Sequence, residues 1–175
     1  MDAEAARFVA MSRQIWEFAE TGYQEQKSSA LLAEELRKSG FRVETGVAGM
    51  PTAFVASTGS GKPVIAIIGE YDALPGLSQK TVPEKNPEVA GASGHGCGHN
   101  LFGVAAMHAA IVVKRVMEEQ KLSGTLRFYG TPAEEGGGGK IHMIRAGLFK
   151  DVDAALTWHP WDFNAPSNQN WLATV

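Results

Sequence analysis

Two glycine-rich windows of the sequence hold the side chains best suited to bind a metal ion. The first window, residues 94–100, reads GHGCGHN. Cys97 and His99 are two residues apart, so in an extended backbone both side chains point the same way. A thiolate and an imidazole placed together can bind a divalent cation such as Zn²⁺. A buried, inert cysteine beside a hydrogen-bonded histidine has the same pattern, and this pair alone leaves both interpretations open.

The second window, residues 131–140, reads TPAEEGGGGK. It lies between a predicted strand and a predicted helix, and open α/β sheets bind ligands in loops that follow their strands. Adjacent carboxylates point in different directions, so one of Glu134 and Glu135 can bind a metal while the other takes a proton from water. The alternative is an acidic turn that complements the dipole of the next helix. A phosphate-binding loop is excluded, because no glycine lies five positions before Gly139 and Ile141 follows Lys140.

Two further strand ends carry residues of the same kind. Glu70 and Asp72 directly follow a predicted buried strand, and His159 ends the next predicted strand after the second window, just before Pro160. A carboxylate such as Asp72 can orient a metal-bound histidine. The alternatives are a solvated strand end and a turn histidine. Taken together, one thiolate, two imidazoles and a carboxylate suit Zn²⁺, or Mn²⁺ or Co²⁺ if water oxygens join.

The elements that must position these residues follow from hydrophobic periodicity and turn residues. The pattern predicts helices over 4–20, 28–39, 100–119 and 138–146, with Leu101, Val104 and Ile111 on one apolar face of the third. It predicts strands over 41–44, 52–57, 64–69, 125–129, 153–159 and 171–175, and a long loop over 74–94. Strands that alternate with helices from Val64 onward indicate an α/β layered fold.

Composition and charge exclude several classes of protein. The 175 residues are 44% hydrophobic and 20% charged, which is too apolar for disorder throughout. A net charge of −3 offers no broad basic surface for nucleic acid. The densest apolar run, residues 64–68, is far shorter than the ~20 residues that cross a bilayer, so we expect no membrane partner. The N-terminus lacks the apolar region of a secretory signal, and the single cysteine excludes an intrachain disulfide, so we expect a cytoplasmic protein.

Four motifs in a fixed order carry a resemblance to a known family. Residues 69–75 read GEYDALP, residues 94–100 GHGCGHN, residues 132–137 PAEEGG and residues 158–160 WHP. This order resembles the M20 metallopeptidase family, in its amidohydrolase branch. Within that branch the likeness is to aminobenzoyl-glutamate hydrolases, because Asn100 follows the histidine and residues 156–160 read LTWHP.

The resemblance implies a helix–sheet–helix catalytic domain of zinc-peptidase type with two divalent metal ions, Zn²⁺ or Mn²⁺. It implies that four residues bind metal, that Glu134 is the general base, and that Asp72 is a supporting carboxylate. The four implied ligands are Cys97, His99, Glu135 and His159. Glu70 stands where other branches of the family have a ligand histidine, so the resemblance assigns it no ligand role.

The resemblance also implies that more chain belongs to the domain. Family members continue into a lid or dimerisation domain, then return to the catalytic domain and supply a further metal-binding histidine. We therefore expect residues 1–175 to be the N-terminal portion of the catalytic domain, inactive alone. The full-length form is expected to be a homodimer or a heterodimer with a related subunit.

The expected reaction is hydrolysis of the amide between an acyl or aroyl group and an amino acid, in an N-acyl amino acid or an aminobenzoyl-glutamate type of substrate. The metal polarises the carbonyl and lowers the pKa of bound water, and Glu134 takes the proton. Two alternatives are a metal-free thiol hydrolase using Cys97 and a non-catalytic interaction module that holds a metal. A thiol hydrolase would leave the Glu134–Glu135 pair without a function. The sequence predicts that the atoms of the four ligands converge, with His159 no more than ~10 Å from Cys97 if both belong to a two-metal cluster.

Overall fold

The computed structural model describes residues 2–160, so the strand predicted at 171–175 lies outside the described residues. Five strands and four helices follow one another with a single short 3-10 helix, η1, in this part of the chain. Their bounds are α1 Asp2–Phe18, α2 Gln26–Lys38, β1 Arg42–Thr45, η1 Val47–Gly49, β2 Phe54–Ser60, β3 Val64–Gly69, α3 His99–Glu119, β4 Gly124–Gly130, α4 Gly139–Arg145 and β5 Ala154–Leu156.

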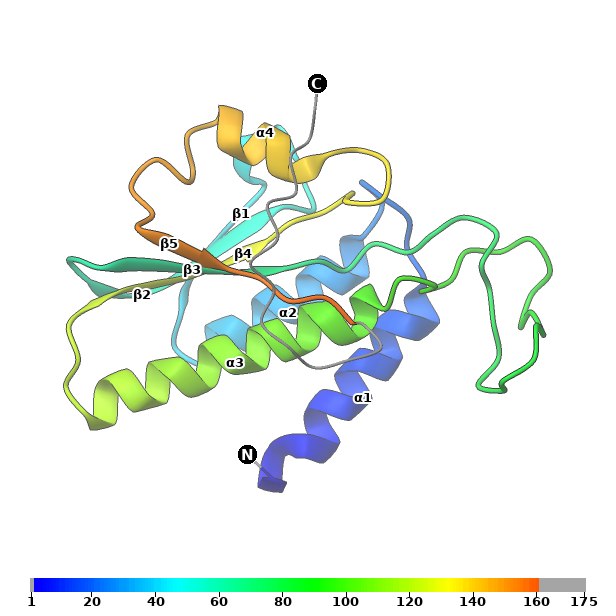
Figure 1. Cartoon of the computed structure of the whole chain (residues 1–175), viewed down its shortest axis with the longest axis horizontal. Helices are drawn as coiled ribbons and strands as arrows, with labels where there is room; N and C mark the ends of the chain where they lie inside the picture. The colour runs from blue at the N-terminus through cyan, green and yellow to red at the C-terminus, as the bar shows by residue number, and fades with distance from the viewer. Residues whose placement is uncertain (1, 161–175) are drawn as a thin grey trace.

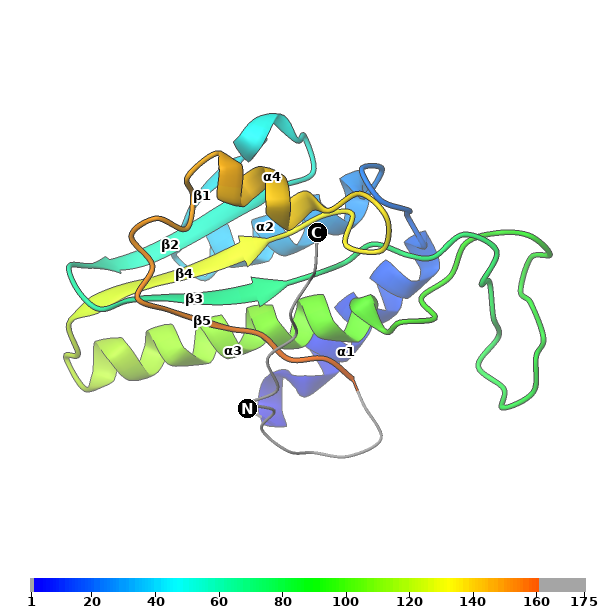
Figure 2. The ribbon, with the colours of Figure 1, turned by 45° about the horizontal axis from the view of Figure 1, so that its top comes forward.

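The strands form one mixed sheet in the order β1-β2-β4-β3-β5 (Figure 2). β3 pairs in parallel with both β4 and β5, while β2 pairs antiparallel with β1 and β4. Because β3, β4 and β5 run in the same direction, the loops that follow them leave the sheet at one edge. This edge is where the sequence places its chemically competent side chains.

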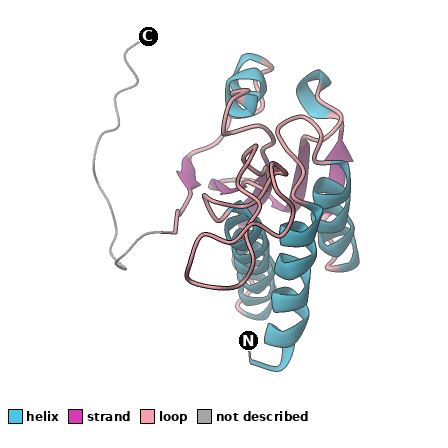
Figure 3. Ribbon diagram, turned by 90° about the vertical axis from the view of Figure 1, so that its right-hand side faces the viewer, coloured by secondary structure: helices cyan, strands magenta, loops and turns pink. Residues whose placement is uncertain are grey.

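Helices cover both faces of this sheet, which confirms the predicted helix–sheet–helix fold. α1, α2 and α3 lie against one face, and α4 with η1 lies against the other (Figures 1 and 3). β3 packs on both sides: Ile65 and Ile67 face the larger core under α1–α3, and Ala66 and Ile68 face the smaller core under α4. A strand buried on both faces reads as a continuous apolar run, as residues 64–68 do.

α2 is capped at its start by the carboxylate of Glu20 and stops just before Gly40. The Glu20 carboxylate accepts hydrogen bonds from the free backbone N–H groups of Lys27 and Ser28, at 3.0 and 2.9 Å. This satisfies donors that the first turn of a helix leaves unpaired. The helix stops before Gly40, whose φ of 83° lets the chain turn away. The connector between α1 and α2 is thereby tied to the start of α2.

α3 differs from its prediction in which face is buried. Phe102, Met107 and Ala110 are buried, whereas Leu101 is 53% exposed, so the predicted face was wrong for that residue. The reason is the close crossing of α3 with β3 at Gly103, where an added Cβ would overlap the carbonyl oxygen of Glu70. By length and composition alone, α3 is also apolar enough to cross a bilayer, although it contains no long uninterrupted apolar run. In this structure its apolar residues Phe102, Met107 and Ile111 pack in the core.

The predicted strand at 153–159 is shorter than expected. β5 comprises only Ala154–Leu156, pairs with β3 alone among the described strands, and all three residues are exposed. His159 therefore follows the strand by three residues. The predicted loop over 74–94 is confirmed as an irregular arm closed by backbone hydrogen bonds between Leu74 and Gly94, at 2.9 and 3.0 Å (Figure 1).

The crossing at Gly103 gives a testable expectation for stability. Gly103→Ala forces a methyl group against backbone that no side-chain rotation can relieve, so we expect a loss of about 1–3 kcal/mol in the free energy of unfolding. Urea denaturation measures it. Gly136→Ala is the matched control, because its added Cβ meets no atom within 4 Å. Equal stability of the two variants would contradict the close crossing.

Candidate metal centre and active site

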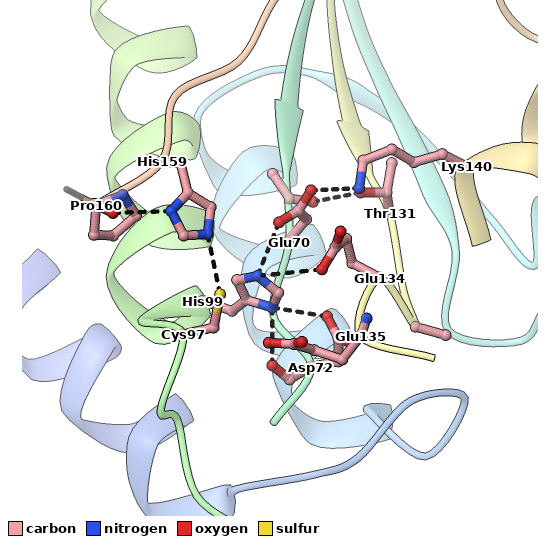
Figure 4. Close-up of polar contacts among 12 residues, drawn as sticks. Glu70, Asp72, Cys97, His99, Thr131, Glu134, Glu135, Lys140, His159 and Pro160 are labelled. Atoms are coloured by element: carbon pink, nitrogen blue, oxygen red, sulfur yellow. Dashed lines mark hydrogen bonds and ion pairs between the residues drawn. The ribbon is translucent and has the colours of Figure 1, made fainter. Parts of the chain in front are cut away.

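Four segments bring the predicted site residues to one edge of the sheet (Figure 4). The loop after β3 carries Glu70 and Asp72, and the start of α3 carries His99, with Cys97 just before it. The loop after β4 carries the two adjacent glutamates, and the segment after β5 carries His159. The residues thus come from points more than 80 positions apart in the chain.

A buried histidine and aspartate form the centre of the site. Asp72 is 1% exposed and His99 is fully buried. His99 Nδ1 lies 2.9 Å from Oδ1 of Asp72 and 3.0 Å from its carbonyl oxygen, so this ring nitrogen carries the proton and donates it. The other nitrogen, Nε2, therefore points away from Asp72. A carboxylate that accepts a hydrogen bond from a metal-binding histidine imposes the same orientation on the ring.

The second histidine meets the cysteine. His159 Nε2 lies 3.0 Å from Cys97 Sγ, and its Nδ1 donates to the carbonyl oxygen of Pro160 at 2.9 Å. Ligand atoms of Cys97, His99 and His159 all lie within 4.8 Å of one another. The predicted convergence of these three residues is therefore what the structure shows.

The convergence has a different cause from the one inferred from sequence. The backbone at Cys97–His99 is not extended: Gly98 has φ 84°, and His99 is already the first residue of α3. A left-handed residue of this kind costs least as glycine. The turn at Gly98 brings both side chains into the site, and an added Cβ there would lie 3.1 Å from the ring of Pro160.

A second group of possible ligand atoms shares His99. Oε2 of Glu70 lies 3.0 Å from His99 Nε2, and Oε2 of Glu134 lies 3.8 Å from it. These three residues also lie within 4.8 Å of one another. Glu70 is 6% exposed and forms an ion pair with Lys140. Sequence reasoning gave Glu70 no ligand role; its position at the end of a doubly buried strand was the available signal.

Glu135 lies at the margin of these two groups. Its backbone N–H donates to Oδ2 of Asp72 at 2.9 Å, so Asp72 links the Glu134–Glu135 loop to His99. Its carboxylate belongs to neither group of mutually close ligand atoms among the described residues, so the predicted convergence of all four ligands is not seen for Glu135. Oε1 of Glu135 is nevertheless buried without a hydrogen-bond partner in the described structure.

The ionisation of these groups reflects crowded negative charge. Burial alone would lower the pKa of His99, but its contacts with Asp72 and Glu70 outweigh burial and raise it to about 10. Burial and the neighbouring Glu135 carboxylate raise the pKa of Cys97 to about 12. Burial, together with the charge of Glu70, also raises the pKa of Glu134. Without a further cation, the Cys97 thiol and the His99 imidazole are thus protonated at neutral pH.

These observations fit a divalent metal. His99 Nε2 and Glu135 Oε1 are buried polar atoms that lack a well-directed hydrogen bond in the described structure, and such atoms normally have a partner. A set of thiolate, imidazole and carboxylate donors suits zinc, and also manganese or cobalt when oxygen ligands join. A cation at the site would offset the burial and the neighbouring negative charge that keep Cys97 protonated.

Comparison with known proteins agrees with this geometry. The model of peptidase family M20/M25/M40 matches residues 66–171. The chain is 50% identical to one of the subunits of p-aminobenzoyl-glutamate hydrolase from Escherichia coli K12, over the whole of this chain and 37% of that protein. It is 37% identical to thermostable carboxypeptidase 1 of Saccharolobus solfataricus, over 86% of this chain and 38% of that protein.

A solved structure supports the same grouping. The Bacillus subtilis YXEP protein, a dinuclear metal binding peptidase from the M20 family, matches with a TM-score of 0.75 and 28% identity, over 88% of this chain and 42% of that one. The chain thus spans about two fifths of the length of these relatives. With four ordered motifs gathered at one sheet edge and a family model matched over most of the chain, the protein belongs to peptidase family M20/M25/M40, a family of metal-dependent hydrolases.

Proposed function

We propose that the full protein hydrolyses the amide bond between an acyl or aroyl group and an amino acid, with aminobenzoyl-glutamate as the first substrate to test. The observation that carries the proposal is the buried Asp72–His99 pair. Its Nε2 lies 3.0 Å from Glu70 and 3.8 Å from Glu134, and ligand atoms of Cys97 and His159 lie close to the same imidazole. The substrate choice rests on the name of the relative that shares 50% of its residues with this chain.

The proposed metal ligands are Cys97, His99, Glu135 and His159, holding two ions of zinc or manganese together with residues from the remainder of the full protein. A metal bound there supplies a Lewis acid that polarises the scissile carbonyl and makes water more acidic. Asp72 keeps His99 in the tautomer that presents Nε2 to the metal, and its other oxygen holds the backbone of Glu135.

Glu134 is the proposed general base. Its side chain is 42% exposed, so water can reach it, and its Oε2 lies 3.8 Å from the ligand nitrogen of His99. Burial raises the pKa of this carboxyl, which brings its basicity nearer to working pH. The carboxylate would take a proton from the attacking water and then return it to the leaving amide nitrogen.

A thiol hydrolase is the second candidate, because Cys97 Sγ and His159 Nε2 are 3.0 Å apart as in a nucleophile–base pair. The electrostatics oppose it. A catalytic thiolate needs a lowered pKa and a positive environment, whereas burial and Glu135 raise the pKa of Cys97 to about 12. Chelation should abolish activity of the metal hydrolase and leave a thiol hydrolase active.

The Escherichia coli relative is named as one subunit of its hydrolase, which supports a further proposal, that the full protein works in a complex with a related subunit. A second copy of the same chain is the alternative. Co-purification of the full-length protein and its mass in solution distinguish the two.

Substitution of each adjacent glutamate in the full-length protein should distinguish the role of the base from that of the metal ligand. Glu134→Gln keeps the shape of the side chain and removes its basicity, so bound metal should stay near wild type while kcat falls by roughly 10²–10⁴. Glu135→Gln should instead lower the metal content, and excess metal should restore part of the activity. Elemental analysis and steady-state kinetics measure both. The reverse pattern would exchange the two roles.

Metal affinity should rise with pH, because the metal displaces protons from Cys97 and His99, whose pKa values are about 12 and about 10 without metal. Each released proton changes affinity about tenfold per pH unit below its pKa. Competition titration of the full-length protein with Zn²⁺ between about pH 6 and 8 should show this. Cys97→Ser should weaken binding and reduce the slope by about one proton.

His142→Gln is the control for the titration, since this residue lies on α4 and is in neither group of mutually close ligand atoms. It should bind metal with the affinity and pH slope of the wild type. If Cys97→Ser also kept both, the thiolate would not be a ligand.

A further inference from the structure

The connector between α1 and α2, residues 19–25, contacts three of the four segments that carry the site. The backbone N–H of Ala73, beside Asp72, donates to the carbonyl oxygen of Glu20 at 2.8 Å. The Ser93 hydroxyl, in the segment that leads to Cys97, donates to the carbonyl oxygen of Ala19. Two side chains of the connector, Tyr23 and Glu25, reach the Glu134–Glu135 loop. The family match begins at residue 66, so this connector lies outside it.

Two side chains of the connector hold the glutamate loop from both sides. Oε1 of Glu25 accepts a hydrogen bond from the backbone N–H of Ala133 at 2.7 Å. The Tyr23 hydroxyl donates to the carbonyl oxygen of Gly137 at 2.5 Å. The two anchored residues lie directly before Glu134 and two positions after Glu135. Both ends of the segment that carries the two carboxylates are thus attached to the same short connector.

The connector and the glutamate loop pack so closely that larger residues do not fit at Gly22 or Gly137. An added Cβ at Gly22 would lie 3.0 Å from Cβ of Ala133, and one at Gly137 would overlap the ring of Tyr23. Ala133 itself has φ 54°, a left-handed conformation that an alanine adopts only when its surroundings impose it. The residue whose N–H Glu25 holds is therefore the strained residue that sets the direction of Glu134.

Burying the Glu25 carboxylate costs free energy that its hydrogen bond to the loop offsets. The residue is fully buried, although carboxylates are rarely buried unless hydrogen-bonded or paired. Of its two carboxylate oxygens, Oε1 accepts the hydrogen bond from Ala133 N–H, while Oε2 is buried without a hydrogen-bond partner in the described structure. Glu20, five positions earlier in the same connector, instead binds the first turn of α2 through Lys27 and Ser28.

We propose that Glu25 and Tyr23 are positioning residues, which hold the 131–139 loop so that Glu134 and Glu135 keep separate orientations against His99 and Asp72. Neither side chain has to touch substrate or metal for this. The inference builds on the proposed function, in which Glu134 is the base and Glu135 a ligand. Its structural part, the fixing of the loop, is independent of the reaction catalysed.

Hydrogen exchange followed by mass spectrometry tests the structural part in the full-length protein. In Glu25→Ala the peptide covering residues 131–139 should exchange at least about tenfold faster than in wild type, because the Ala133 N–H loses its acceptor. Glu25→Gln should restore slow exchange, since the amide oxygen can accept the same bond. Tyr23→Phe should accelerate the same peptide and leave the protein folded, because only a hydroxyl is removed.

Glu20→Ala is the matched control. It removes a carboxylate from the same connector and frees the start of α2, so exchange should increase over residues 26–30 and stay unchanged over 131–139. Equal acceleration of 131–139 in Glu20→Ala and Glu25→Ala would show general loosening and overturn the proposal. Unchanged exchange there in both Glu25→Ala and Tyr23→Phe would also overturn it.

Kinetics on the metal-loaded protein test the catalytic part. Glu25→Ala should lower kcat by roughly 10²-fold, the effect of a misplaced group of about 1 Å, with KM within about threefold of wild type. Glu25→Gln should recover most of kcat, and Glu20→Gln should keep wild-type kcat. Wild-type protein that hydrolyses no amide would refute the proposed function while the exchange results still decide the positioning role.

Discussion

The contact between the buried carboxylate of Asp72 and the imidazole of His99 is the interaction on which the rest of the site depends. One Asp72 oxygen orients His99 and the other holds the backbone of Glu135, so a single side chain joins the loops after β3 and β4 to the start of α3. Both residues are almost fully removed from water. Charge at such a place persists only when it is paired, which is why these elements must arrive together.

The sheet makes this meeting possible. Three parallel strands end at one edge, and each delivers its loop there, while the crossing of α3 at Gly103 sets how close His99 comes to Glu70. The antiparallel part of the sheet, β1 and β2, contributes core rather than chemistry. The α1–α2 connector then closes the edge from the outside. The directions of the strands and of α3 thus determine where the site's loops lie, and the side chains of those loops then form the site.

The accumulation of acidic groups at this edge is a constraint of its own. Four carboxylates, those of Glu70, Asp72, Glu134 and Glu135, lie near the His99 imidazole and the Cys97–His159 pair, and Lys140 is a nearby cation, paired with Glu70. Contacts with Asp72 and Glu70 raise the pKa of His99, and burial together with the Glu135 carboxylate raises the pKa of Cys97. A cluster of carboxylates with a thiol and imidazoles favours the binding of a divalent cation. This electrostatic need, more than any single distance, supports a metal centre.

Local patterns in the amino-acid sequence were enough to predict the elements, the layered α/β class, the family and most of the residues that meet, because periodicity, glycine stops and short motifs are local properties. β3 was placed to the residue, since a doubly buried strand has no ambiguity of face. Four features emerged only in three dimensions: the turn at Gly98, the exposure of Leu101, the contact of Glu70 with His99 and the hold of Glu25 on Ala133. Each of these joins residues distant in the chain or depends on how closely two elements approach, and no local pattern carries that information.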